Sequence, residues 1–154
     1  MLFRSKINDL QDPTAKMSKS AASNAGVIDI LDSTDVNVKK IKSAVTDTGK
    51  EVRFDEKEKP GISNLLTIHS ALSGKSIADL ETEFAGKGYG DFKGAVADVV
   101  TSYFAPVREK TNALLQDEAA LMKILHEGSL KARAVASTTL QKVYTGLGLV
   151  PGNK

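Results

Sequence analysis

The 154-residue chain has no cysteine, only two histidines and few aromatic side chains. Without cysteine, neither disulfides nor thiolate metal ligands are available. The histidines, His69 and His126, lie far apart without further ligands at metal-site spacing, so no metal-binding residue is assigned. No apolar run approaches the roughly 20 residues that cross a bilayer, and Met1 to Arg4 is too short for a signal peptide. A cytoplasmic protein without membrane contact is therefore expected.

An excess of one charge sign is also missing. The 21 lysines and arginines nearly balance 19 acidic residues, and the net charge of +2 is too small to indicate nucleic-acid binding by itself. The excess is concentrated near the C-terminus, where Glu127 stands among five bases: Lys123, Lys131, Arg133, Lys142 and Lys154. A basic helix face can contact an RNA backbone, but a solvated helix face explains these charges equally well.

Apolar residues at helical spacing predict several helices in the first part of the chain. The expected helix starts are Ser23 or Asn24, Thr34, Pro60 and Ser76. The apolar positions of these helices are Val27, Ile28 and Leu31; Val38, Ile41 and Val45; Ile62, Leu65, Leu66 and Leu72; and Ile77, Leu80 and Phe84. Gly74 is expected to end the third helix. The charged stretch from Glu56 to Lys59 is expected to be solvated.

The second part of the chain predicts longer helices. The longest should run from about residue 91 to about residue 115, with Phe92 and Tyr103 in the core. Asp117 is expected to cap a shorter helix, which Gly128 separates from the last one. The apolar stripes of successive helices must pack on one another, which predicts an all-α helical bundle.

Neither histidine is proposed as a catalyst. His69 lies on the apolar side of its expected helix, so we expect a core residue whose polar atoms have partners. His126 is expected near a helix end, where its side chain could bind the last carbonyls.

The segment from Lys16 to Ser20 carries the chemistry of a phosphate-binding loop. Its sequence, Lys-Met-Ser-Lys-Ser, combines two ammonium groups three residues apart with two hydroxyl donors. No apolar period runs through residues 12 to 24, so the segment is expected to be a surface loop. On composition alone, a solvated lysine- and serine-rich loop explains the same residues.

The same five residues spell the mobile ATP loop of class I aminoacyl-tRNA synthetases. Residues 5–20 (SKINDLQDPTAKMSKS) resemble the same region of bacterial tryptophanyl-tRNA synthetases. So do residues 40–47 (KIKSAVTD), 59–66 (KPGISNLL) and 86–93 (GKGYGDFK), in the family's order and with similar gaps. The resemblance covers the chain from about Ser5 to about Leu149, and the tyrosine enzymes resemble it less.

The resemblance implies a role for each loop residue. The family joins tryptophan to ATP with release of pyrophosphate, and then transfers tryptophan to its tRNA. Lys16 and Lys19 match the loop lysines that stabilise the leaving phosphates, with Lys19 as the stronger contact; both are assigned as catalytic. The residues expected to bind the ATP phosphates are Lys16, Met17, Ser18, Lys19 and Ser20. Met17 would pack the closed loop, and Mg²⁺ would accompany ATP.

The resemblance also implies that the chain is the C-terminal part of a longer enzyme. Complete members carry, before the loop, a nucleotide-binding domain with a His-Ile-Gly-His-like signature, and neither histidine here has that context. Residues 1–24 would end the catalytic domain, and residues 25–154 would form the helical domain that binds the anticodon end of tRNA(Trp). The tryptophan pocket would lie outside this chain, which would be inactive alone. The parent enzyme would be a homodimer.

Two alternatives to a tryptophan enzyme stay open. The chain could belong to another class I synthetase, such as a tyrosine enzyme, which amino-acid-dependent pyrophosphate exchange would distinguish. It could instead be a free-standing helical module that binds RNA or a partner protein and retains the loop as a relic.

Overall fold

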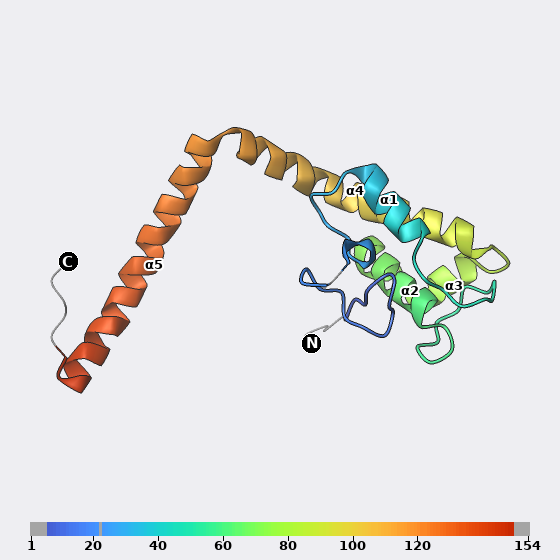
Figure 1. The fold of residues 1–154 in the computed structure, drawn as a ribbon, viewed down its shortest axis with the longest axis horizontal. Helices are drawn as coiled ribbons and strands as arrows, with labels where there is room; N and C mark the ends of the chain where they lie inside the picture. Colours follow the sequence, from blue (N-terminus) through green and yellow to red (C-terminus); the bar gives the residue numbers. More distant parts are fainter. Residues whose placement is uncertain (1–5, 22, 150–154) are drawn as a thin grey trace. The chain divides into compact units, whose positions relative to one another are not determined.

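The computed structural model describes residues 6–21 and 23–149, in two compact units that divide between Arg108 and Glu109. Regular structure in these residues is helical, apart from one isolated antiparallel bridge between Asn8 and Lys16. The helices are η1 (Asn24–Gly26), α1 (Thr34–Lys42), α2 (Pro60–Ser73), α3 (Ile77–Glu83), α4 (Tyr89–Gln116) and α5 (Glu118–Leu147) (Figure 1). The predicted all-α class is confirmed.

Local sequence signals set several helix boundaries. Pro60 occupies the first turn of α2, and Gly74, with φ of 75°, ends that helix. The Ser76 hydroxyl accepts the Asp79 N–H at the start of α3 and donates to the Asp79 carboxylate at 2.6 Å. These three predicted boundaries are confirmed. The cap of α1 is Ser33, one residue before the predicted Thr34.

The core of the first unit is built mainly by α2 and α4, each of which contributes four buried apolar side chains. The buried cluster consists of Leu10, Ile41, Ala44, Val52, Ile62, Leu65, Leu66, Ile68, Leu80, Phe84, Phe92, Val96, Ala97 and Val100. Burying one large apolar side chain contributes about 1.5–3 kcal/mol. Leu10 belongs to the segment just before the loop Lys16–Ser20, so this segment is anchored in the same core as the helices.

The predicted helix around Val27, Ile28 and Leu31 is wrong. Only the three-residue η1 forms there, capped by Ser23, and the chain then turns before α1. Polar side chains hold this turn: the Asp29 carboxylate accepts the Leu31 N–H at 2.9 Å, and the Lys40 ammonium donates to the Val27 carbonyl at 2.9 Å. Side-chain partners of this kind satisfy the backbone without a helix.

The segment after α1 also differs from the sequence expectation. Val45 was expected on the helix face, but α1 ends at Lys42, and the Val45 N–H donates to the Leu10 carbonyl at 2.8 Å. On its other side, the Val45 carbonyl lies against Gly61 of α2, where a Cβ atom would collide with it. Glycine at the start of α2 therefore permits a close backbone approach.

Several expectations for the second half are corrected. Residues 118–147 form one continuous helix through Gly128, so α5, with 30 residues, exceeds α4, with 28. Tyr103 was expected in the core but is 53% exposed, and no described residue of α5 is buried. His126 lies exposed within α5 and not at a helix end. None of the helices in residues 6–21 and 23–149 is long and apolar enough to cross a bilayer.

Candidate functional site: the loop Lys16–Ser20 and its frame

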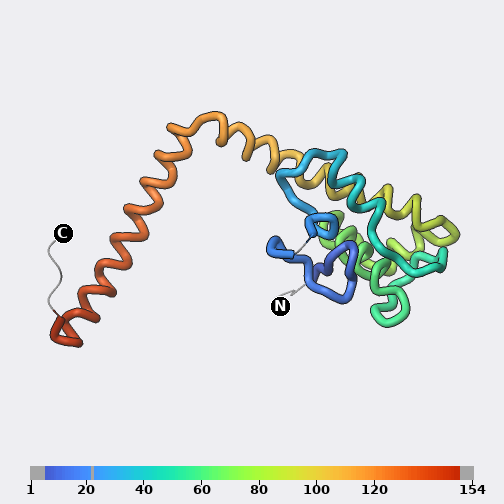
Figure 2. The backbone as a smooth tube through the Cα atoms, viewed as in Figure 1, coloured from blue at the N-terminus to red at the C-terminus, as the bar shows by residue number. Residues whose placement is uncertain are grey.

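The loop Lys16–Ser20 stands on a stem in which the backbone doubles back on itself (Figure 2). The Met17 N–H donates to the Ile7 carbonyl at 3.1 Å, and the Asp9 N–H donates to the Ala15 carbonyl at 2.9 Å. The bridge between Asn8 and Lys16 lies between these bonds. The pairing fixes the backbone of Lys16, at the entrance to the loop.

The turn of the stem is held by two carboxylates. Asp9 accepts the N–H groups of Gln11 and Asp12 at 2.8 and 3.2 Å. Asp12 accepts both the Thr14 hydroxyl, at 2.6 Å, and the Thr14 N–H, at 3.0 Å. These hydrogen bonds from Thr14, led by the hydroxyl, lower the pKa of Asp12. Gly26 packs on Asp9 so closely that a Cβ atom would collide with the carboxylate.

The tip of the loop is a turn closed by serine. The Ala21 N–H donates to the Ser18 carbonyl at 3.1 Å, and the two hydroxyls of Ser18 and Ser20 are 3.0 Å apart. Lys16 and Lys19 are exposed, and neither forms an ion pair within the described residues. A cleft of about 290 Å³ borders Lys19. The structure thus presents two ammonium groups and two hydroxyls to solvent, which suits an anionic ligand.

Met17 is the anchored residue of the loop. Its side chain is half-buried against the core cluster and lines an apolar cavity of about 240 Å³ together with Ile7, Ile28, Ile68 and Leu72. The last two residues belong to α2, so the middle of the loop rests on that helix. In this conformation Met17 therefore packs on an apolar surface, which is the kind of contact that was expected of it in the closed loop.

A second polar cluster joins three segments that are distant in the sequence. The Lys59 ammonium lies 3.2 Å from the Asp47 carboxylate and 2.9 Å from the Tyr89 hydroxyl, which in turn donates to Asp47 at 2.8 Å. Burial raises the pKa of Asp47, but hydrogen bonds from Tyr89, Gly49 and Lys59 outweigh burial and lower it overall. Lys59 was expected to be solvated and is only 9% exposed, so that expectation is wrong.

His69 is a core residue, as expected. It is 4% exposed, its ring stacks on Phe92 with centroids 6.2 Å apart, and its Nδ1 lies 3.1 Å from the Ser73 hydroxyl. Burial lowers the pKa of His69. Within residues 6–21 and 23–149, no three His, Cys, Asp or Glu side chains gather into a metal site.

The family model described as tRNA synthetases class I (W and Y) matches residues 2–105. The chain belongs to this family. Among curated relatives, tryptophan–tRNA ligase 2 of Streptomyces avermitilis is 50% identical over 146 residues, which are 95% of this chain and 43% of the relative. Tryptophan–tRNA ligase of Listeria monocytogenes is 47% identical over 144 residues, 94% of this chain and 43% of the relative. The chain therefore spans less than half the length of these relatives.

Solved structures agree with this class I assignment. Tryptophanyl-tRNA synthetase of Mycoplasma pneumoniae has a TM-score of 0.80 and 36% identity, covering 95% of this chain and 46% of that one. The enzyme of Campylobacter jejuni, complexed with ADP and tryptophan, has a TM-score of 0.66 and 34% identity, covering 92% and 44%. The resemblance to tryptophanyl-tRNA synthetases drawn from the four sequence blocks is confirmed.

The sequence identified the loop but missed the residues that hold it. Asn8 and Asp9 lie in the stem and Asn64 is hydrogen-bonded to it, while Asp47 and Lys59 form the second polar cluster with Tyr89. All five are polar and follow no helical or alternating pattern, so composition assigns them to solvent. Their one signal was position, because all five fall inside the sequence blocks shared with the family.

Proposed function

We propose that the chain is the C-terminal part of a tryptophan–tRNA ligase, which activates tryptophan with ATP and transfers it to tRNA(Trp). The observation that carries the proposal is the exposed loop Lys16–Ser20, mounted on a paired stem in a chain that matches tryptophan enzymes over nearly its whole length. The division into a catalytic end, residues 1–24, and a tRNA-binding helical region, residues 25–154, is part of the proposal.

The loop would act on the leaving group of the activation step. The tryptophan carboxylate attacks the α-phosphorus, and negative charge builds on the departing β- and γ-phosphates. Cationic donors that meet this charge in the transition state accelerate the step. Both ammonium groups are exposed and form no ion pair among the described residues, so both are available to a ligand. Lys19, at the turn, would supply the stronger contact and Lys16 a supporting one, as the resemblance to the family implies. Ser18 and Ser20 would donate to phosphate oxygens, while Met17 keeps the loop on α2.

Other components would come from outside the described residues. The tryptophan pocket and the adenine side of the ATP site would belong to the part of the relatives that this chain does not match; the chain spans 43% of the Streptomyces avermitilis relative. Mg²⁺ would arrive with ATP, and the described residues contain no cluster of carboxylates and histidines dedicated to it. The basic residues of α5, including Lys131 and Arg133, would face the tRNA, and the parent enzyme would be a cytoplasmic homodimer.

The test is a chimera in which this chain replaces the matching 146 residues of the Streptomyces avermitilis relative. We expect exchange of pyrophosphate into ATP that depends on tryptophan and not on tyrosine. Because the relative supplies the amino-acid pocket of the chimera, the tRNA that is charged distinguishes the two branches: charging of tRNA(Tyr) and not of tRNA(Trp) would assign the chain to the other branch of the family. A folded chimera without exchange, beside an active parent relative, would contradict the proposal and favour a free-standing helical module.

A further inference from the structure

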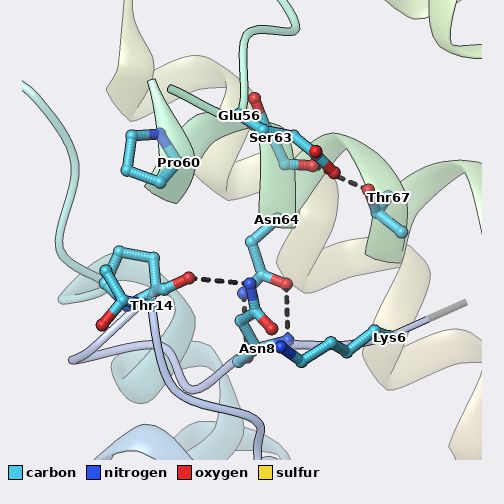
Figure 3. A pocket seen from close by; sticks show the side chains of 9 residues that line it. Lys6, Asn8, Thr14, Glu56, Pro60, Ser63, Asn64 and Thr67 are labelled. Atoms are coloured by element: carbon cyan, nitrogen blue, oxygen red, sulfur yellow. Dashed lines mark hydrogen bonds between the residues drawn. The ribbon is translucent and has the colours of Figure 1, made fainter. Parts of the chain in front are cut away.

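One side chain of α2, the carboxamide of Asn64, forms hydrogen bonds to the backbone of the stem in the way that a neighbouring strand would. The Asn64 carboxamide accepts the Asn8 N–H at 2.9 Å and donates to the Asn8 carbonyl at 2.9 Å (Figure 3). The two residues are 56 positions apart in the sequence. Asn64 is 6% exposed and Asn8 is half-buried, so both bonds are partly shielded from water. They satisfy both backbone groups of Asn8, which would otherwise be costly to bury.

Asn8 is also the residue that bridges to Lys16. A continuous chain of contacts therefore runs from α2 through Asn64 to Asn8, and from Asn8 to the first lysine of the loop. The Asn8 side chain adds to this frame by donating to the Pro13 carbonyl at 2.7 Å, across the turn of the stem. These contacts fix the position of the stem relative to α2, and they therefore fix the position of Lys16, where the loop begins.

We propose that Asn64 is a positioning residue that sets where the loop Lys16–Ser20 stands on the helical frame. Where it concerns ATP, this inference rests on the proposed function. Asn64 touches no phosphate itself; it acts through Asn8 and the stem. A displacement of about 1 Å at a catalytic group can cost on the order of a hundredfold in rate. Loss of the two bonds is therefore expected to affect activation more than substrate affinity.

The neighbours of Asn64 on α2 have other partners and supply a matched control. The Thr67 hydroxyl donates to the Ser63 carbonyl at 2.8 Å, a bond within the helix, and Thr67 borders the same polar cavity as Asn64. The Ser63 hydroxyl accepts the Asp55 N–H at 2.8 Å and so holds a different segment. Thr67→Val changes a hydroxyl on the same helix without touching the stem.

The first experiment measures amide hydrogen exchange by NMR in the full 154-residue chain, with urea unfolding measured in parallel. In Asn64→Leu, we expect the Asp9 and Met17 amides to exchange roughly tenfold faster, since both donate within the stem. Thr67→Val should leave them unchanged. If Asn64→Leu fails to fold, Asn64→Asp retains the acceptor for the Asn8 N–H and loses only the donor, so a smaller acceleration is expected. Equal exchange in wild type and the folded Asn64 variant would overturn the proposal.

The second experiment uses the chimera and separates positioning from stability. At a temperature well below the melting of every variant, Asn64→Leu should lower kcat of tryptophan-dependent pyrophosphate exchange roughly ten- to hundredfold, with the KM for tryptophan unchanged. Thr67→Val should retain kcat. A variant that melts earlier yet keeps both kcat and stem exchange would show a merely structural Asn64 and overturn the proposal. An inactive unmodified chimera would refute the proposed function, whereas the exchange experiment on the chain would still decide the role of Asn64.

Discussion

At the residue scale, the two lysines of the loop differ in how the backbone holds them. Lys16 lies in the bridge with Asn8, whereas Lys19 lies in the turn between Ser18 and Ala21. Because the backbone of Lys16 is held by pairing, its ammonium group can move only by rotation of the side chain. A lysine at a turn can also follow a moving phosphate as the turn shifts, as expected of a loop that closes over ATP.

This difference predicts unequal effects of the two alanine substitutions. In the chimera, Lys19→Ala should lower kcat of tryptophan activation by on the order of a hundredfold, about 3 kcal/mol, because the contact forms with the leaving phosphates. Lys16→Ala should cost less, and the KM for tryptophan should stay unchanged in both. Lys131→Ala, an exposed lysine of α5, is the control for loss of one charge. Normal pyrophosphate exchange by Lys19→Ala would remove this lysine from the mechanism.

His69 predicts a pH dependence of stability. Burial lowers its pKa below the ordinary 6.5, with Lys75 lowering it further and Glu83 opposing. The unfolded chain therefore takes up the proton at higher pH than the folded one. The stability contributed by neutral His69 is complete above pH 6.5 and is lost as the pH falls toward the folded-state pKa.

We expect the stability difference between wild type and His69→Gln, measured by urea unfolding, to shrink as the pH falls from about 7 to about 5. A constant difference for His69→Gln would mean that this histidine titrates alike in the folded and unfolded chain.

At the element scale, the sequence correctly predicted helix boundaries that are set by neighbouring residues. It failed where residues distant in the sequence determine the backbone conformation. Pro60, Gly74 and Ser76 act on their own neighbours, so their effects are readable from the chain. The turn after Val27 depends on Asn37 and Lys40, which reach back from α1 to its carbonyls. The periodicity of apolar residues carries no information about hydrogen bonds from side chains to a distant backbone. For the same reason the hydrogen bonds of Asn64 to the stem were not predicted.

The close approach between α2 and the chain after α1 gives a prediction with an internal control. Gly61→Ala places a Cβ against the Val45 carbonyl, and overpacking against backbone should lower the free energy of unfolding by about 1–3 kcal/mol. Gly128→Ala, in the open middle of α5, should raise it by about 0.5–1 kcal/mol because alanine favours the helix. Urea unfolding of both variants measures the two effects. A Gly61→Ala variant as stable as wild type would mean that the two segments separate readily.

At the scale of the whole molecule, the proposed function gives this chain one side of a site. The loop, its stem and the core beneath are present, while the relatives that match the chain are more than twice as long as the matched part. The apolar positions of α5 show the limit of the sequence here. Leu140 and Leu147 align at helical spacing and were expected to pack on neighbouring helices, and they are 49% and 68% exposed in this chain.

The isolated chain should not bind ATP measurably. A loop must lose conformational entropy when it closes on a ligand, and no adenine pocket offsets that loss in the residues the structure describes. Exposed lysines gain little from a screened triphosphate at physiological salt. Calorimetry with millimolar ATP should therefore show no saturable heat. Saturable binding in the micromolar range would require a nucleotide site within the helical region itself.

The most direct test of the account is aminoacylation by the chimera, since it needs the loop and the helical region to act together. Purified chimera would be supplied with ATP, labelled tryptophan and either tRNA(Trp) or tRNA(Tyr), beside the unmodified Streptomyces avermitilis relative. We expect tryptophan to be attached to tRNA(Trp) and none to tRNA(Tyr), and we expect the activity to be lost when Lys16 and Lys19 are both replaced by alanine. A folded chimera that charges no tRNA(Trp) while the relative does, or one that charges it equally well without the two lysines, would contradict the account.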